Sequence, residues 1–259
     1  MKKKKLLTFI SALTLCAMLF NLCGCFLFNG DSAYEDYMTT ITLHGDGEDL
    51  PFEAKYGRKV ETTSLTKKGY YLKGYYANPD GTNRYFDSAG KSLTEWNKDF
   101  PVEFYPAWEE IGKLTYRETA LQENPQKITL QSNVFSHKFE LSPELVNAAK
   151  GNMDQKLLVK CSYKFTCTRP YESNRVTVVI WFTNADTSGE TYGETSWVYQ
   201  EPKMASGEYP YIERELSAEI PAGELLHGNL FLKFKASMNG YKKCIKNISL
   251  SISFISPEN

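Results

Sequence analysis

The sequence predicts a mainly β protein whose larger part, residues 111–259, is an antiparallel β-sandwich of jelly-roll type. Apolar and polar residues alternate over many short segments there, the period of strands with one buried and one wet face. About eight such segments follow one another, separated by turns rich in Asn, Asp, Gly and Pro. The chain also holds 17 Tyr and 15 Phe, residue types that favour strands over helical bundles.

The first 24 residues have the order of an export signal. Four lysines, Lys2–Lys5, precede the apolar run Leu6–Leu22. The tetrapeptide Leu22–Cys25 then resembles the bacterial lipobox, and the resemblance implies cleavage before Cys25 and a lipid on its thiol. It also implies an extracytoplasmic, lipid-anchored location in the cell envelope. The alternative is an uncleaved membrane anchor, although the apolar run reaches only about the minimum length for a span.

Residues 25–38 show no periodicity, and we expect them to be a short tether between the lipid and the folded chain. The whole chain has a formal charge of −1, and loss of residues 1–24, with four lysines and no acidic residue, makes it −5. A mildly acidic chain without a basic stripe is a poor partner for nucleic acid. The predicted partners are therefore the membrane and an extracellular ligand.

Residues 39–110 contain a series of short motifs in a fixed order. They are the strand Ile41–Leu43 with its Gly-rich turn, Tyr56–Val60, Gly69–Tyr76 and the closing Phe104–Trp108. The series resembles the Listeria–Bacteroides repeat of the internalin B-repeat family, with departures at Tyr75, where Trp is usual, and at Pro106. The resemblance implies a small β-grasp-like fold that serves as a stalk or protein-contact module. We expect its aromatic residues to form a core, and the single copy argues against a repeat array.

Residues 111–259 carry the sandwich strands and one helix. The predicted strands are Ile128–Leu130, Phe135–Leu141, Leu157–Cys167, Val176–Phe182, Ser196–Gln200, Ile212–Ile220, Leu230–Ser237 and Ile248–Phe254. Ser142–Lys150 is the predicted helix, because Ser142 suits the N-cap, Pro143 the first turn and Gly151 the position after the end.

Four cysteines remain after loss of the signal: Cys25, Cys161, Cys167 and Cys244. Cys161 and Cys167 fall on one predicted strand, roughly 20 Å apart at about 3.3 Å per residue, too far for a disulfide. Either Cys244 bridges to one of them or the thiols are free. No cysteine or histidine spacing suggests a metal site, and no cofactor is predicted.

No catalytic motif is recognisable, so the chain is predicted not to be an enzyme. His137 could act as a base for Cys161, but a core histidine is the simpler interpretation. Glu213 and Glu215 could form a glycosidase pair, or only the wet face of a strand. The segment 184–190 could offer oxygen ligands to Ca²⁺, or be an ordinary polar loop.

The candidate ligand-binding residues are the aromatics Trp181, Trp197, Tyr199 and Tyr211. Aromatic rings mounted on a sheet can stack on sugar rings, although aromatic residues also commonly seal a core. We therefore predict a non-catalytic, lipid-anchored surface protein that binds an extracellular glycan or protein through the sandwich. The alternatives are a structural or assembly lipoprotein that contacts partner proteins, and a polysaccharide hydrolase.

Overall fold

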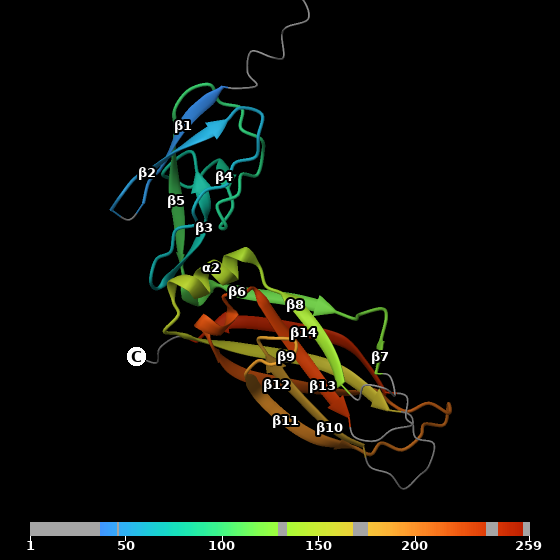
Figure 1. The fold of residues 1–259 in the computed structure, drawn as a ribbon. Helices are drawn as coiled ribbons and strands as arrows, with labels where there is room; N and C mark the ends of the chain where they lie inside the picture. Colours follow the sequence, from blue (N-terminus) through green and yellow to red (C-terminus); the bar gives the residue numbers. More distant parts are fainter. Residues whose placement is uncertain (1–36, 46, 129–133, 168–175, 237–242, 256–259) are drawn as a thin grey trace, which may run out of the picture. The chain divides into compact units, whose positions relative to one another are not determined.

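A computed structural model describes residues 37–45, 47–128, 134–167, 176–236 and 243–255 (Figure 1). Cys25, the predicted signal at 1–24 and nearly all of the predicted tether lie outside these residues. The described chain divides into two compact units. The first combines the described residues up to Thr62 with Tyr75–Asp87 and Lys91–Tyr105, and the second combines Thr63–Gly74 and Ser88–Gly90 with the described residues from Pro106 onward. The B-repeat identity of residues 39–110 and the boundary at residue 110 stay predictions.

The strands of the N-terminal part form a five-stranded sheet in the order β2-β1-β5-β3-β4. Their bounds are β1 (Met38–Leu43), β2 (Leu50–Lys55), β3 (Tyr70–Tyr76), β4 (Arg84–Phe86) and β5 (Val102–Glu110). β1 pairs antiparallel with β2 and parallel with β5. Phe86, Trp96 and Phe104 are buried in the first unit, and the ring centroids of Phe86 and Phe104 lie 5.2 Å apart, edge to face.

Two antiparallel sheets in the second unit make the sandwich, in the orders β12-β9-β14-β6 and β11-β10-β13-β8. The strands are β6 (Thr115–Ala120), β8 (Val134–Glu140), β9 (Lys156–Cys167), β10 (Val176–Thr183), β11 (Thr191–Tyr199), β12 (Ile212–Pro221), β13 (Asn229–Ala236) and β14 (Lys243–Phe254), and the short β7 (Gln126–Ile128) also pairs with β14. We number the eight sandwich strands from one to eight in chain order, leaving out β7. One sheet then contains strands one, eight, three and six, and the other contains strands two, seven, four and five. This is the jelly-roll order, so the prediction of a mainly β chain with an antiparallel sandwich is confirmed. The β-grasp-like fold of residues 39–110 stays a prediction.

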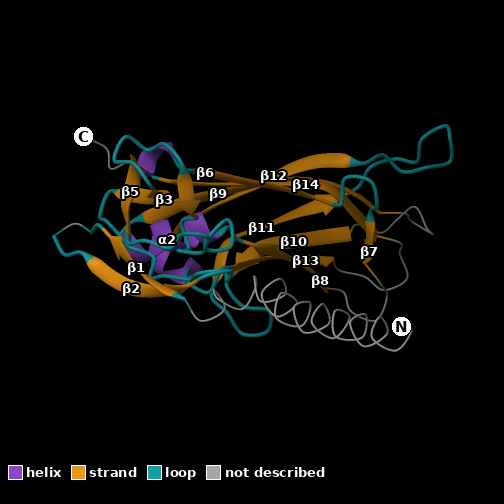
Figure 2. Cartoon of the chain, turned by 90° about the horizontal axis from the view of Figure 1, so that it is seen from above, coloured by secondary structure: helices purple, strands orange, loops and turns teal. Residues whose placement is uncertain are grey.

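The two sheets face each other across an aromatic interior, and Figure 2 shows them as separate layers. Phe234 of β13 lies 5.1 Å from Phe165 and 5.6 Å from Tyr163 of β9, ring centroid to ring centroid. Every second residue of β9 is buried, as the alternation predicted. In β14 the alternation holds on each side of an irregularity that shifts the buried set by one residue between Ile245 and Ile248. The interior is therefore filled by side chains from both layers.

Three strands were not predicted: β2 and β4 of the N-terminal sheet, and β6 of the sandwich. β6 turns Tyr116, Glu118 and Ala120 inward, and this set contains a carboxylate and a hydroxyl instead of an apolar series. The single hydroxyl proton of Tyr116 is shared between the Glu118 carboxylate and the Glu140 carbonyl oxygen, which lies 3.1 Å away. Because these polar groups bond to each other at a sheet edge, the strand needs no apolar alternation.

The predicted helix is present as α2 (Pro143–Gly151). The Ser142 hydroxyl accepts a hydrogen bond from the Leu145 amide at 3.2 Å, the capping contact expected from its position. Two short 3₁₀ turns, η1 (Ile111–Lys113) and η2 (Ala222–Leu225), were not predicted.

Candidate functional site

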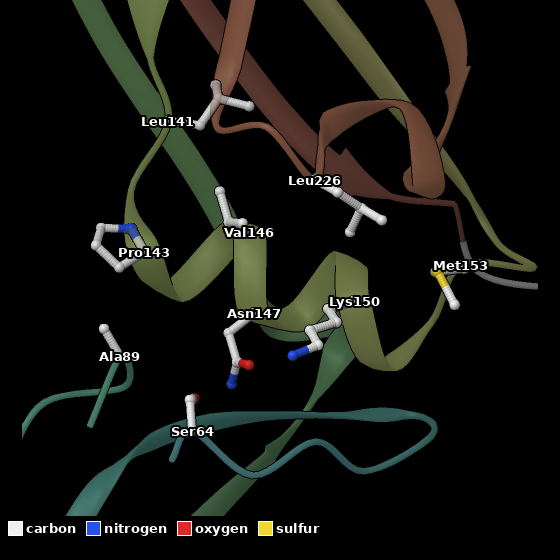
Figure 3. Close-up of a pocket in the computed structure, with 9 residues that line it drawn as sticks. All are labelled: Ser64, Ala89, Leu141, Pro143, Val146, Asn147, Lys150, Met153 and Leu226. Atoms are coloured by element: carbon white, nitrogen blue, oxygen red, sulfur yellow. The ribbon is translucent and has the colours of Figure 1, made fainter. Parts of the chain in front are cut away.

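A cavity of about 640 Å³ opens beside α2 in the second unit (Figure 3). Its lining residues are Ser64, Ala89, Leu141, Pro143, Val146, Asn147, Lys150, Met153 and Leu226. Sequence reasoning named none of them as a site, because they come from separate segments and most are aliphatic. The only local signal was the spacing of the four helical members, which places them on one face of α2.

The outer face of the sheet β11-β10-β13-β8 carries one of the predicted aromatics, Trp181. Its neighbours in β10, Ile180 and Phe182, are buried in the sandwich, so Trp181 points to the opposite side and is partly exposed. Among the described residues it makes no hydrogen bond and no ring contact. The indole is therefore available on the solvent side of the sheet.

Charged residues stand on both sides of this indole. Trp181 is opposite Lys233 of β13, and a bulge in the pairing with β11 leaves Gly193 and Glu194 opposite it on the other side. Gly193 has φ of 59°, and a Cβ atom there would lie 2.6 Å from the Ala218 side chain of the facing sheet. A side chain at Gly193 would therefore point at the facing sheet, and the exposed Glu194 is left beside the outer face.

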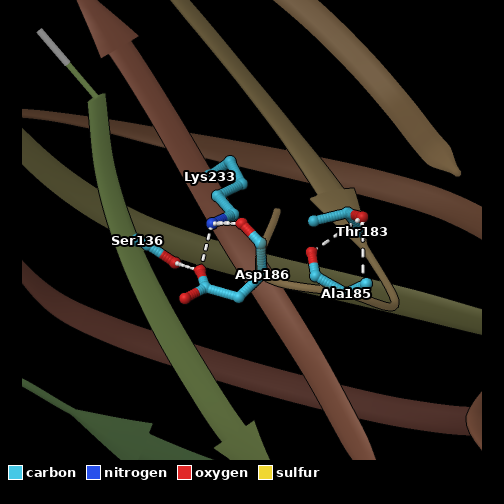
Figure 4. Close-up of polar contacts among 5 residues, drawn as sticks. All are labelled: Ser136, Thr183, Ala185, Asp186 and Lys233. Carbon is cyan, nitrogen blue, oxygen red and sulfur yellow. Dashed lines mark hydrogen bonds and ion pairs between the residues drawn. The ribbon is translucent and has the colours of Figure 1, made fainter. Parts of the chain in front are cut away.

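Lys233 is fixed by the loop that follows β10 (Figure 4). Only 8% exposed, its ammonium donates to the Asp186 carbonyl oxygen at 2.7 Å and also bonds the Asp186 carboxylate. Ser136 donates to the same carboxylate at 3.1 Å. The hydrogen bond from Lys233, with help from Ser136, lowers the pKa of Asp186. These hydrogen bonds hold the loop against β13 and β8.

These bonds bear on the calcium interpretation of residues 184–190. The carboxylate of Asp186 is engaged by an ammonium, and the Asn184 side-chain amide donates to Glu224 at 2.6 Å. Within the described ranges no group of three or more His, Cys, Asp or Glu residues could hold a metal ion. The loop is thus organised by protein contacts.

Trp197, in contrast, faces the interior. Its indole N–H donates to the Tyr163 hydroxyl at 3.1 Å, and its ring meets Phe165 edge to face at 5.3 Å. The Arg214 guanidinium carbon lies 5.3 Å from the ring centroid on the other side. Trp197 therefore packs between the two sheets.

The two predicted tyrosines also lie away from Trp181. Tyr199 is completely buried, and its hydroxyl donates to the Pro210 carbonyl oxygen at 2.8 Å. Tyr211, at the entry to β12, has the Lys246 ammonium 3.9 Å from its ring centroid. The structure therefore does not bring the four candidate residues Trp181, Trp197, Tyr199 and Tyr211 together on one surface, since the sheet separates Trp181 from the interior pair.

Cys161, Cys167 and Cys244 form no disulfide with one another, so the possible bridge to Cys244 is not formed. Cys167 is opposite Lys243 and Cys244 is opposite Thr166, so successive residues of the ladder send the two thiols to opposite faces. Burial raises the pKa of Cys161 to about 12. A thiol that stays protonated at neutral pH is a poor nucleophile.

His137 is half-buried on the inner face of β8. Its ring lies 4.7 Å from that of Phe139, and its Nε2 atom is buried without a hydrogen-bond partner among the described residues. Burial lowers its pKa, against the opposing charge of Glu118. The carbonyl bond expected for a core histidine is thus missing at Nε2, but the neutral ring suits an aromatic environment.

The acidic residues considered for catalysis are on the surface. Glu213 and Glu215 are both exposed on β12, and Glu213 forms an ion pair with Lys164 at 3.8 Å. The cavity beside α2 has no acidic lining residue. Neither place offers the enclosed carboxylate pair that glycoside hydrolysis requires.

The fold and these surfaces define the class as a jelly-roll β-sandwich protein with a partly exposed tryptophan on one outer face. No family model and no curated protein matches the chain. A solved structure of the Gx strain of infectious bursal disease virus aligns with this chain with a TM-score of 0.29 and 10% sequence identity. The alignment covers 78% of this chain and 56% of the viral chain. Across the described residues, no helix is both long and apolar enough to cross a membrane.

Proposed function

We propose that this protein is a non-catalytic, lipid-anchored protein of the bacterial envelope that binds an extracellular glycan through the outer face of the sheet β11-β10-β13-β8. The observation that carries the proposal is the partly exposed indole of Trp181, which has no ring or hydrogen-bond partner among the described residues. The C–H faces of sugar rings are apolar, and an indole is the largest flat apolar surface that a side chain offers.

Polar groups around the indole support the choice of a sugar. Glu194 and Lys235 are exposed near it, and they can accept and donate hydrogen bonds to hydroxyl groups. Lys233 and Asp186 are already bonded to each other, which fixes the loop beside the indole before any ligand arrives. An apolar surface with a few placed polar groups is the usual composition of a ligand site.

The location rests on the tetrapeptide Leu22–Cys25. Expression in a bacterium with labelled palmitate tests it directly: the chain takes up label and fractionates with membranes, whereas Cys25→Ser takes up none. Label retained by Cys25→Ser would contradict lipidation at this residue.

A glycan array tests the binding proposal. The full chain, reconstituted in lipid nanodiscs, is screened as wild type, as Trp181→Ala and as Trp197→Phe. We expect binding to be lost with Trp181→Ala and kept with Trp197→Phe, a matched change of the interior tryptophan. An array without hits, or hits that Trp181→Ala leaves unchanged, would contradict the proposal.

A second candidate is an assembly protein that uses the same face to contact another protein. Val134 and Val198 are 40% and 47% exposed on that face, at the ends of β8 and β11. Exposed aliphatic residues suit a protein surface better than a sugar. Val198→Lys separates the two: it abolishes capture of a protein partner, whereas glycan binding at Trp181 survives.

A further inference from the structure

The cavity beside α2 is distinct from the outer face that carries Trp181. Four of its lining residues, Pro143, Val146, Asn147 and Lys150, recur at the helical spacing and form one continuous wall. On the other side of α2, Leu145, Ala148 and Ala149 are buried in the sandwich core. Its volume of about 640 Å³ lies within the range of roughly 300–1,000 Å³ found for small-molecule sites.

The other walls of the cavity are mainly apolar. Leu141 and Leu226 close it on the sandwich side, and Met153 stands at the rim with 56% of its surface exposed. Ala89 and Ser64 come from the two shorter segments of the second unit. An apolar cavity with an exposed methionine can adapt to the shape of a hydrophobic group.

Polar contacts hold the segment around residue 65 against α2. The Asn147 side chain donates to the Leu65 carbonyl oxygen at 3.0 Å, and the Gly69 amide donates to the Asn152 side chain at 2.7 Å. A Cβ atom on Gly151 would lie 3.2 Å from the Thr66 Cβ atom, so the lack of a side chain allows this close approach. These contacts hold the wall of the cavity that includes Ser64 in place.

One lining residue carries a charge. Lys150 makes no ion pair within the described part of the chain, and Figure 3 shows its side chain on the same side of α2 as Asn147, with the ammonium towards the cavity. No acidic side chain lines the cavity. Lys150 is exposed at this open cavity and has no ion pair among the described residues. An apolar cavity with one such cation is complementary to an apolar molecule with one negative charge.

We propose that this cavity binds a small anionic amphiphile, with its carboxylate, sulfonate or phosphate on the Lys150 ammonium and its apolar body against Val146, Leu226 and Met153. The amide of Asn147 stands one turn from Lys150 and can contribute to the same head group. This site is independent of glycan binding at Trp181, and each can fail without the other.

The test uses three probes with the same body and different charge: 4-phenylbutyrate, 4-phenylbutan-1-ol and 4-phenylbutylamine. Their binding to the full chain in nanodiscs is measured by isothermal titration calorimetry, with empty nanodiscs as the blank. We expect 4-phenylbutyrate to bind about tenfold more tightly than the alcohol, and the amine not to bind, because a hydrogen bond to a charged group contributes about 1.5 kcal/mol or more.

Two variants and one control complete the experiment. Lys150→Met keeps the aliphatic stem and removes the charge. We therefore expect this variant to bind 4-phenylbutyrate and the alcohol with about equal affinity. Val146→Trp fills the cavity and abolishes binding of both, with the fold checked by circular dichroism. Lys160→Met, which changes an exposed lysine of β9 outside the cavity, alters nothing. No binding by the wild type, or an unchanged preference in Lys150→Met, would overturn the proposal.

Discussion

Trp181 and Trp197 lie on neighbouring strands of one sheet but on opposite faces of it. Trp197 is held by the Tyr163 hydroxyl, the ring of Phe165 and the Arg214 guanidinium, whereas Trp181 has no such contact among the described residues. The same residue type therefore packs inside the sandwich in one place and lies partly exposed on the outer face in the other. The face of the strand, and not the residue type, decides which role is possible.

The largest expected effect is on the inner face. Trp197→Ala removes a packed indole and leaves a void between the sheets, so we expect the free energy of unfolding of the second unit to fall by about 3 kcal/mol. Hydrogen exchange of the amides of β9 and β13 measures this unit separately from the first. Equal losses for Trp197→Ala and Trp181→Ala would remove the distinction between the two faces.

Tyr199→Phe is a smaller change on the same inner face. It removes the hydroxyl that donates to the Pro210 carbonyl oxygen and leaves the ring in place. Because a buried acceptor then loses a partner, we expect a loss of about 1 kcal/mol. Urea titration of the variant against wild type measures it, and a loss as large as that of Trp197→Ala would contradict the role given to the hydroxyl.

His137 gives the inner face a dependence on pH. Burial lowers its pKa in the folded chain, so the unfolded chain binds the proton more readily and stability is lost as pH falls below the ordinary value of about 6.5. Thermal melts from pH 8 to pH 5 should show this decline, and His137→Phe should reduce it. The exposed His227, changed to Phe, is the control, and it should leave the slope as in wild type.

The strand faces could be predicted from sequence much better than the contacts. Alternation along the predicted strand Val176–Phe182 is enough to place Trp181 on the face opposite Ile180 and Phe182, where the structure has it. Alternation could not predict the contacts of Trp197. These contacts depend on the bulge in the pairing of β10 with β11 and on Phe165, which approaches from the facing sheet. A cross-sheet neighbour depends on how the two layers stack, which no local pattern records.

The cavity beside α2 was beyond prediction for a related reason. The helix was predicted with its Ser142 cap, and the spacing of Val146, Asn147 and Lys150 was visible. Its other walls, such as Ser64 and Leu226, are more than a hundred residues apart in sequence and carry no motif.

On the outer face, acid should release the loop that Asp186 anchors. The Lys233 hydrogen bond lowers the pKa of Asp186 in the folded chain, so its contribution is present above the unfolded value of about 3.9 and is lost as pH falls through the lower folded value. Lys233→Met should abolish this part of the acid transition, monitored by hydrogen exchange of the loop after β10. An unchanged transition would show that the pair does not hold the loop. Ser136→Ala, which removes the weaker partner, should give a smaller change in the same direction.

The smallest effect on stability belongs to Trp181 itself. Trp181→Ala removes a partly exposed ring without ring contacts among the described residues, so the free energy of unfolding should change by no more than about 0.5 kcal/mol. Trp181→Phe keeps a smaller aromatic surface, so glycan affinity should fall in the order wild type, Phe, Ala while urea midpoints stay together. If affinity and stability fell together across this series, Trp181 would be a packing residue like Trp197. A graded loss of affinity at constant stability is the result that separates recognition from packing on this sheet.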